Sequence, residues 1–129
     1  MTDNKDNILT DKNGRVVEVF KDTDRGFFGI RYHDEDKRAG LTAFLDTKGT
    51  DKAPNGERIF YHTEIGEEYG GSGLASVLIK HAVHITQDEG RDIVAVCPFV
   101  KSWLEKHGED VVWRNPTPED LKTLKNALD

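Results

Sequence analysis

The sequence predicts an α+β domain with a mixed, mostly antiparallel sheet flanked by helices. Several short apolar segments of strand length come first, and a glycine run at residues 70–73 then opens an amphipathic helix. One more apolar segment and a second helix follow. The predicted order is β-β-β-β-α-β-α with a C-terminal helix, because an antiparallel sheet followed by a helical crossover fits these segments.

Four strands are expected before the glycines. Each is a short run in which apolar residues are continuous or alternate, as in a strand with a buried face. They cover residues 16–20, 26–33, 39–45 and 58–65. A charged turn at 34–37 and a loop at 47–57, which holds two glycines and a proline, separate the later strands.

The first helix is expected over residues 74 to about 89, since Leu74, Val77, Leu78 and Ile85 recur at helical spacing. The later elements follow from apolar runs and helix-start residues. They are a strand at 93–96, a helix at 99–106 opened by Pro98, a last strand at 111–113 and a helix capped by Thr117. The final helix carries a stripe of Leu121, Leu124 and Leu128, which would pack on the domain or on a partner.

The chain has 129 residues and a formal net charge of −6, with 24 acidic and 18 basic side chains. This length fits one domain, expected at residues 15–113, after a flexible tail at 1–14 and before a helical extension at 114–129. The acidic balance argues against nucleic-acid and anionic-membrane surfaces, which need basic stripes. One cysteine, no signal segment and no long apolar run predict a cytoplasmic protein.

The glycine run is the strongest functional feature. Gly70, Gly71 and Gly73 lie between a predicted strand and a predicted helix, where backbone N–H groups and the positive helix end converge. Missing Cβ atoms leave room for a phosphate. A P-loop would need a lysine after the last glycine, and a dinucleotide fold would need a glycine where Ser76 stands. A plain strand-to-helix turn is the alternative.

Gly73 and Ala75 occupy the last two fixed places of the pattern Gln/Arg-x-x-Gly-x-Gly/Ala, while Gly70 replaces its first residue. Residues 62–65 precede this pattern, and Cys97-Pro98-Phe99-x-x-x-Trp103-x-x-x-His107 follows it. Over roughly residues 15–112 the chain therefore resembles the GNAT-type (GCN5-related) N-acetyltransferases, in particular their minimal single-domain members. The resemblance implies the GNAT fold, acetyl-CoA or CoA as cofactor, and acetyl transfer to an amine by direct attack in a ternary complex.

The resemblance also implies cofactor-binding residues. Amides of the glycine loop would hold the pyrophosphate, and the N–H group of Ile65 would hold the oxyanion of the tetrahedral intermediate. Further contacts are expected from the loop and the two helices that follow it. These residues are Tyr69, Gly70, Gly71, Ser72, Gly73, Leu74, Ala75, Ser76, Cys97 and Lys101.

Amine acetylation needs a base, because a protonated amine cannot attack a thioester. Glu64 and His62 lie on one face of a strand. The resemblance implies that a carboxylate or imidazole on this strand is the base, with Glu64 the first candidate and His62 the second; a surface pair without a role is the alternative. Cys97 precedes a helix whose dipole favours a thiolate, and the resemblance places it near the thioester, so it could contact the cofactor, accept acetyl transiently or simply pack. The family's general-acid tyrosine is missing from residues 107–113, which leaves water, Cys97 or His107.

The resemblance implies two helices that cover the substrate, and the chain lacks them. This predicts an open site for a protein or peptide side chain, or for a polyamine. A non-catalytic acyl-CoA-binding or sensing module of the same fold is the alternative function. No metal site is expected, since His81, His84 and Asp88 lack a fourth ligand. The acceptor, the acyl-chain preference and the oligomeric state are left open.

Overall fold

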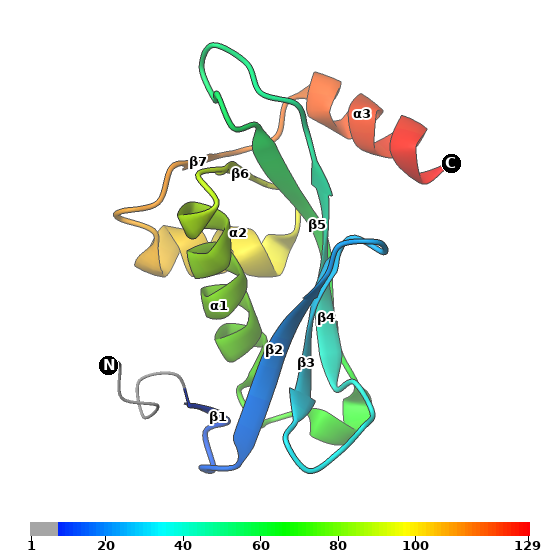
Figure 1. Ribbon diagram of the computed structural model, residues 1–129, viewed down its shortest axis with the longest axis vertical. Helices are drawn as coiled ribbons and strands as arrows, with labels where there is room; N and C mark the ends of the chain where they lie inside the picture. Colours follow the sequence, from blue (N-terminus) through cyan, green and yellow to red (C-terminus); the bar gives the residue numbers. More distant parts are fainter. Residues whose placement is uncertain (1–7) are drawn as a thin grey trace.

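The computed structural model describes residues 8–129, and Figure 1 shows how they are arranged. The strands are β1 (Leu9–Thr10), β2 (Val16–Asp22), β3 (Phe27–Tyr32), β4 (Gly40–Asp46), β5 (Glu57–Ile65), β6 (Asp92–Ala95) and β7 (Trp113–Arg114). The helices are the 3₁₀ turn η2 (Glu67–Tyr69), α1 (Leu74–Asp88), α2 (Pro98–His107) and α3 (Pro118–Leu128). The α+β class and the predicted order of the main elements are confirmed.

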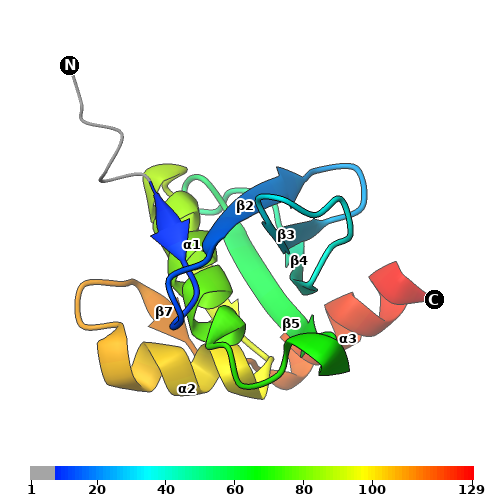
Figure 2. The same ribbon diagram turned by 90° about the horizontal axis from the view of Figure 1, so that it is seen from below.

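The seven strands form one sheet in sequence order. Neighbours from β1 to β5 are antiparallel, whereas β5–β6 and β6–β7 are parallel, because α1 and α2 carry the chain back across the sheet. Figure 2 shows α1 and α3 on opposite sides of β5. The alternation of side chains along β5 explains this: Phe60 packs in the main core with α1, and Ile59 packs against Leu124 of α3.

The pairing of β4 with β5 contains a β-bulge. Phe60 pairs with Phe44 and His62 pairs with Ala43, which leaves Tyr61 as an extra residue on β5. A bulge bends the strand and shifts its side-chain alternation. Beyond it, the odd-numbered residues of β5 turn toward the interior and the even-numbered residues turn toward solvent.

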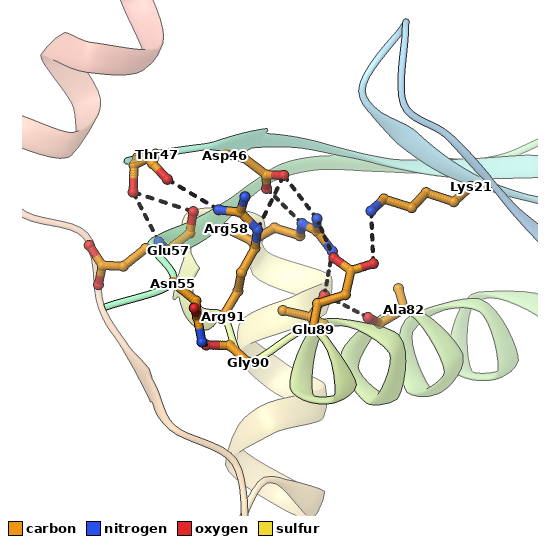
Figure 3. A network of polar contacts seen from close by, with 11 residues as sticks. Lys21, Asp46, Thr47, Asn55, Glu57, Arg58, Ala82, Glu89, Gly90 and Arg91 are labelled. Carbon is orange, nitrogen blue, oxygen red and sulfur yellow. Dashed lines mark hydrogen bonds and ion pairs between the residues drawn. The ribbon is translucent and has the colours of Figure 1, made fainter. Parts of the chain in front are cut away.

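A buried arginine fixes α1 to the sheet (Figure 3). Arg58 of β5 is 1% exposed, and its Nε and Nη2 donate to both carboxylate oxygens of Asp46 on β4 at 2.7 and 2.9 Å. Its Nη1 donates to Thr86 Oγ1 of α1 at 3.1 Å, and Nη2 lies 2.8 Å from Glu89 Oε1. Lys21 of β2 donates to the other Glu89 oxygen at 2.8 Å. A buried guanidinium needs such partners, so the network ties the C-terminal end of α1 to three strands.

The last helix is held by a second arginine. Arg114 of β7 donates to both oxygens of Glu57 at 2.9 Å and to those of Asp120 at 2.7 and 3.0 Å. Asp120 also accepts the N–H of Thr117, whose hydroxyl accepts the N–H of Asp120, so α3 begins with a capping box. The Arg114 guanidinium lowers the pKa of Asp120 to about 2.

The predicted tail at 1–14 needs correction. The segment from residue 8 contains β1, in which Leu9 pairs with Val17, and the following Asp11 is buried. The prediction of a flexible tail is wrong for this segment, because a long-range pairing holds it. Residues 1–7 lie outside the described part of the chain.

The predicted C-terminal elements shift slightly. The last strand is β7, Trp113–Arg114, which pairs in parallel with β6, in place of the predicted 111–113. Only Leu124 of the predicted stripe is buried, while Leu121 and Leu128 are exposed, since α3 touches the sheet along a narrow line. The division into a domain at 15–113 and an extension at 114–129 stays a prediction.

Replacement of Arg58 tests the anchor of α1. Arg58→Ala removes a buried cation and leaves Asp46 and Glu89 facing each other, so we expect a loss of about 3 kcal/mol in the free energy of unfolding. Urea denaturation measures it. Arg25→Ala, at an exposed turn, is the control and should stay within about 0.5 kcal/mol of the parent protein. Equal losses for both variants would contradict this role of Arg58.

Asp120 gives stability a defined pH dependence. Its pKa is lowered in the folded state, so its contribution is present above the unfolded value of 3.8 and disappears as pH falls toward about 2. Asp120→Asn should cost about 2 kcal/mol at neutral pH, and the difference from the parent should shrink in that acid window. Chemical denaturation at a series of pH values measures this, with exposed Glu119→Gln as the control. A difference that is constant with pH would contradict it.

Candidate functional site

The site begins where two parallel strands separate. Pairing between β5 and β6 ends at Phe60 and Ala95, and the N–H groups of Val96 and Cys97 both donate to the Phe60 carbonyl. Beyond this point β5 continues to Ile65, whereas the chain after β6 turns into α2. The edge of β5 past Phe60 therefore has no neighbouring strand on this side.

The backbone of β5 presents unpaired groups to this gap. The Gly66 N–H donates to the Ala39 carbonyl at 2.8 Å, so this pair is a hydrogen-bonded one and the neighbouring pair, Ile65 with Gly40, is not. In an antiparallel ladder the N–H groups of alternate residues point to opposite edges. The N–H groups of Ile65 and Thr63 consequently point away from β4 and into the gap.

The glycine loop leads into α1 beside the same gap. Gly71 and Gly73 have φ of 79° and 76°, a left-handed conformation that other residues seldom adopt. No hydrogen bond between described residues uses the N–H groups of residues 71–76. Six N–H groups without a partner among the described residues and the positive end of a 15-residue helix meet at this loop, an arrangement that suits an anion.

A cavity of about 510 Å³ joins the gap to the glycine loop. It is lined by Thr63, Glu64, Ile65, Tyr69, Gly70, Gly71, Gly73, Leu74, Ala75 and Phe99. Eight of these residues were predicted from the sequence, and Thr63 and Phe99 were missed. Alternation along the strand could have indicated Thr63, which shares a face with Ile65, whereas Phe99 was given no role in the site from the sequence. In the structure its ring is 59% exposed and forms an apolar wall on α2.

Five predicted residues do not line this cavity. His62 is on the solvent side of β5, and Lys101 is exposed on α2. The Ser72 carbonyl accepts a hydrogen bond from the Lys12 N–H at 3.1 Å. Ser76 lines two smaller cavities between α1 and α2, of about 180 and 420 Å³, and Trp103 and His107 also line both. The cavity of about 180 Å³ shares Ala75 and Phe99 with the main cavity, so the two cavities adjoin each other.

Cys97 is the fifth of these residues and belongs to the core. It is 1% exposed, and its Sγ donates to the Thr63 hydroxyl at 3.2 Å. That hydroxyl also bonds to Thr42 Oγ1 at 2.9 Å. Thr63 lines the cavity and Cys97 lies behind it, an arrangement that matches a small packing residue. The catalytic and cofactor-binding roles that the resemblance implies for Cys97 stay predictions.

Glu64 is the carboxylate of the cavity. Its Oε2 lies 3.5 Å from His62 Nε2, and both side chains are exposed. Glu64 and Ile65 also line a second cavity of about 240 Å³, together with Arg38 and Gly66, on the side of β4. The Glu64 carboxylate therefore borders both the cavity at the glycine loop and a separate hollow open to solvent.

Tyr69 lines the cavity, but its hydroxyl is already engaged. The hydroxyl donates to Glu35 Oε1 at 3.0 Å, and the ring lies 5.7 Å from the ring of Tyr32. Burial and the neighbouring Glu35 raise the pKa of Tyr69, so the phenol stays protonated. Among the residues that line the cavity, Glu64 and Tyr69 are the ones that ionise.

Within residues 8–129, no group of three His, Cys, Asp or Glu side chains could hold a metal ion. None of the described helices is both long and apolar enough to span a membrane.

The comparisons with known proteins agree with this geometry. The family model of the GCN5-related N-acetyl-transferases matches residues 28–112, and the chain therefore belongs to this family. The NMR solution structure of a GCN5-like protein from Staphylococcus aureus, a candidate N-acetyltransferase, has the same fold with a TM-score of 0.54. It is 24% identical and covers 78% of this chain and 91% of its own. No curated protein is significantly similar in sequence.

Proposed function

We propose that the protein binds acetyl-CoA and transfers its acetyl group to an amine. One observation carries this proposal: the cavity that Glu64 and Ile65 line is also lined by Gly71, Gly73, Leu74 and Ala75, whose N–H groups are free among the described residues. The loop suits a pyrophosphate, and the gap suits a pantetheine arm that pairs with the free edge of β5. The ring of Phe99 would cover the apolar part of that arm.

The chemistry would be direct attack within a ternary complex, in which much of the rate comes from holding the amine and the thioester together. Glu64, directly or through one water, takes a proton from the ammonium form of the acceptor, and the freed lone pair attacks the thioester carbonyl. The Ile65 N–H stabilises the oxyanion that forms. When the intermediate collapses, the C–S bond breaks, the acetyl group stays on nitrogen, and the nitrogen gives its second proton to water. The CoA thiolate takes a proton from water, and Glu64 returns its own proton to solvent.

Water is the proposed proton source because the other candidates lie elsewhere. The His107 ring lies 5.2 Å from the Trp103 ring, beside the cavities between α1 and α2, and Cys97 is buried. The Tyr69 hydroxyl is bound to Glu35. An aqueous donor needs an open site, and the hollow on the β4 side of Glu64 is open to solvent.

The proposed acceptor is an exposed cationic amine, on a protein or peptide side chain or on a polyamine. In the described chain no helix lies between β2 and β5, so no helical segment covers the hollow beside Glu64. The net charge of −6 favours approach of a cation. A cytoplasmic location stays part of this proposal.

A non-catalytic acyl-CoA-binding module is the second candidate. The observation that favours it is the lack of a free general acid among the residues that line the cavity. Such a module would keep the glycine loop and would need no role for Glu64.

Gly73→Val tests the anion site. A β-branched residue is strained at the φ of 76° that Gly73 adopts, and its side chain adds bulk to the loop. We therefore expect the variant to lose the thermal stabilisation by CoA. Saturation at about 100 Kd adds about 2.7 kcal/mol to the parent protein and raises its Tm by several degrees. Gly26→Val, at a φ of 77° in a distant turn, is the matched control for backbone strain. It should lower the Tm and keep the CoA-dependent shift. Retention of this shift by Gly73→Val would overturn the assignment of the loop.

Glu64→Gln separates the enzyme from the binding module. Loss of a general base should lower kcat by about 10²-fold or more toward a polyamine or a lysine-containing peptide, while the Kd for acetyl-CoA stays unchanged. Glu67→Gln, an exposed carboxylate of η2 outside the cavity, is the matched control. A wild-type protein that binds acetyl-CoA but acetylates no amine would support the binding module. An unchanged kcat in Glu64→Gln would remove Glu64 from the mechanism.

A further inference from the structure

Strand β1, the turn at residues 11–15 and strand β2 form an N-terminal hairpin. This hairpin lies outside residues 28–112, which the family model matches, yet it touches the glycine loop. Asp11 fixes this hairpin. Its Oδ1 accepts the N–H groups of Asn13 and Arg15 at 2.8 and 3.0 Å, and its Oδ2 accepts the Tyr32 hydroxyl at 2.7 Å. The hydrogen bond from Tyr32 lowers the pKa of Asp11, so the carboxylate stays charged and continues to accept these three hydrogen bonds.

Lys12, the next residue, makes the contact with the loop. Its N–H donates to the Ser72 carbonyl at 3.1 Å. A trans peptide directs the carbonyl and the following N–H in opposite directions, so the Gly73 N–H points away from the hairpin. The Lys12 side chain runs along the loop, with its Cβ, Cγ and Cδ 3.6–4.0 Å from where a Cβ on Gly73 would stand. The hairpin thus both orients an amide of the cradle and lays a lysine stem beside it.

The loop itself supplies no positive side chain. Residues 66–76 contain Glu67 and Glu68 and no lysine or arginine. A diphosphate bound there would carry its negative charge into an acidic protein with only backbone dipoles to balance it. A cation from another segment would stabilise such a ligand by charge-assisted hydrogen bonds.

The basic side chains near the glycine loop differ in whether an acidic side chain already pairs with them. Arg15 is paired with Asp34 and Glu35 at 3.2 Å, and Lys37 is paired with Glu68 at 2.7 Å. Among the ion pairs of the described residues, none involves Lys12. Lys12 is exposed and stays available to a ligand on the loop.

We infer that Lys12 is a phosphate-binding residue of the cofactor site, with its ammonium on the diphosphate held by the glycine loop. This inference rests on the proposed binding of CoA. It assigns to the N-terminal hairpin the positive charge that the loop lacks, and it makes that hairpin part of the site.

The experiment compares Lys12→Gln with the parent protein by isothermal titration calorimetry. CoA and dephospho-CoA are the two probes, because both contain the diphosphate and only CoA carries the 3′-phosphate. Lys12→Gln should weaken both by about tenfold and reduce the salt dependence of binding. Lys12→Arg should largely restore the affinity. Lys122→Gln, an exposed lysine on α3, is the matched control for net charge and should bind both as the parent does.

The outcomes separate the two levels of the proposal. A parent protein that binds neither probe overturns the proposed function and, with it, the role of Lys12. If the parent binds and Lys12→Gln binds equally well, the role of Lys12 is overturned while the proposed function stands. If only CoA binding weakens, Lys12 contacts the 3′-phosphate and the diphosphate assignment is wrong. The backbone bond to Ser72 is kept in the variant, and an unchanged Tm without ligand confirms that the fold is intact.

Discussion

The position of α1 on the sheet depends on the buried Arg58 guanidinium. The charge cannot be left unpaired in the interior, and Asp46, Thr86 and Glu89 supply its partners from β4 and from the C-terminal end of α1. Because α1 is a rigid rod of 15 residues, fixing its last turn also sets where its first turn lies. The glycine loop leads directly into that first turn, so the network at one end of the helix positions the loop at the other.

The gap beside β5 results from the geometry of the backbone. Four residue pairs join β5 to β6, after which β6 ends, while the bulge at Tyr61 re-aims the rest of β5. The edge that remains offers N–H groups without a strand to receive them. Backbone groups therefore make up much of the cavity wall, and a few side chains, such as Glu64 and Phe99, complete it.

Family membership defines the fold and the general activity, and the individual features of this chain lie around that common part. Among the described residues no helix lies between β2 and β5, and the side chains that line the cavity include no free general acid. The N-terminal hairpin, closed by Asp11, lies directly against the glycine loop. These features together describe a member of the family in which a segment outside the matched residues lies against the glycine loop.

The sequence by itself determined the order of strands and helices, the glycine turn ahead of α1, and Glu64 as the candidate base. The elements and the glycine turn depend on local patterns, namely alternation, helical spacing and the freedom of glycine, and Glu64 was found from its place on a strand together with the family resemblance. Tertiary structure alone decided the bulge at Tyr61, the burial of Cys97 against Thr63, the exposure of Phe99 and the contact of Lys12 with the loop. All four depend on pairings between segments far apart in the chain, and no local pattern encodes which partner a strand edge or a hairpin will meet.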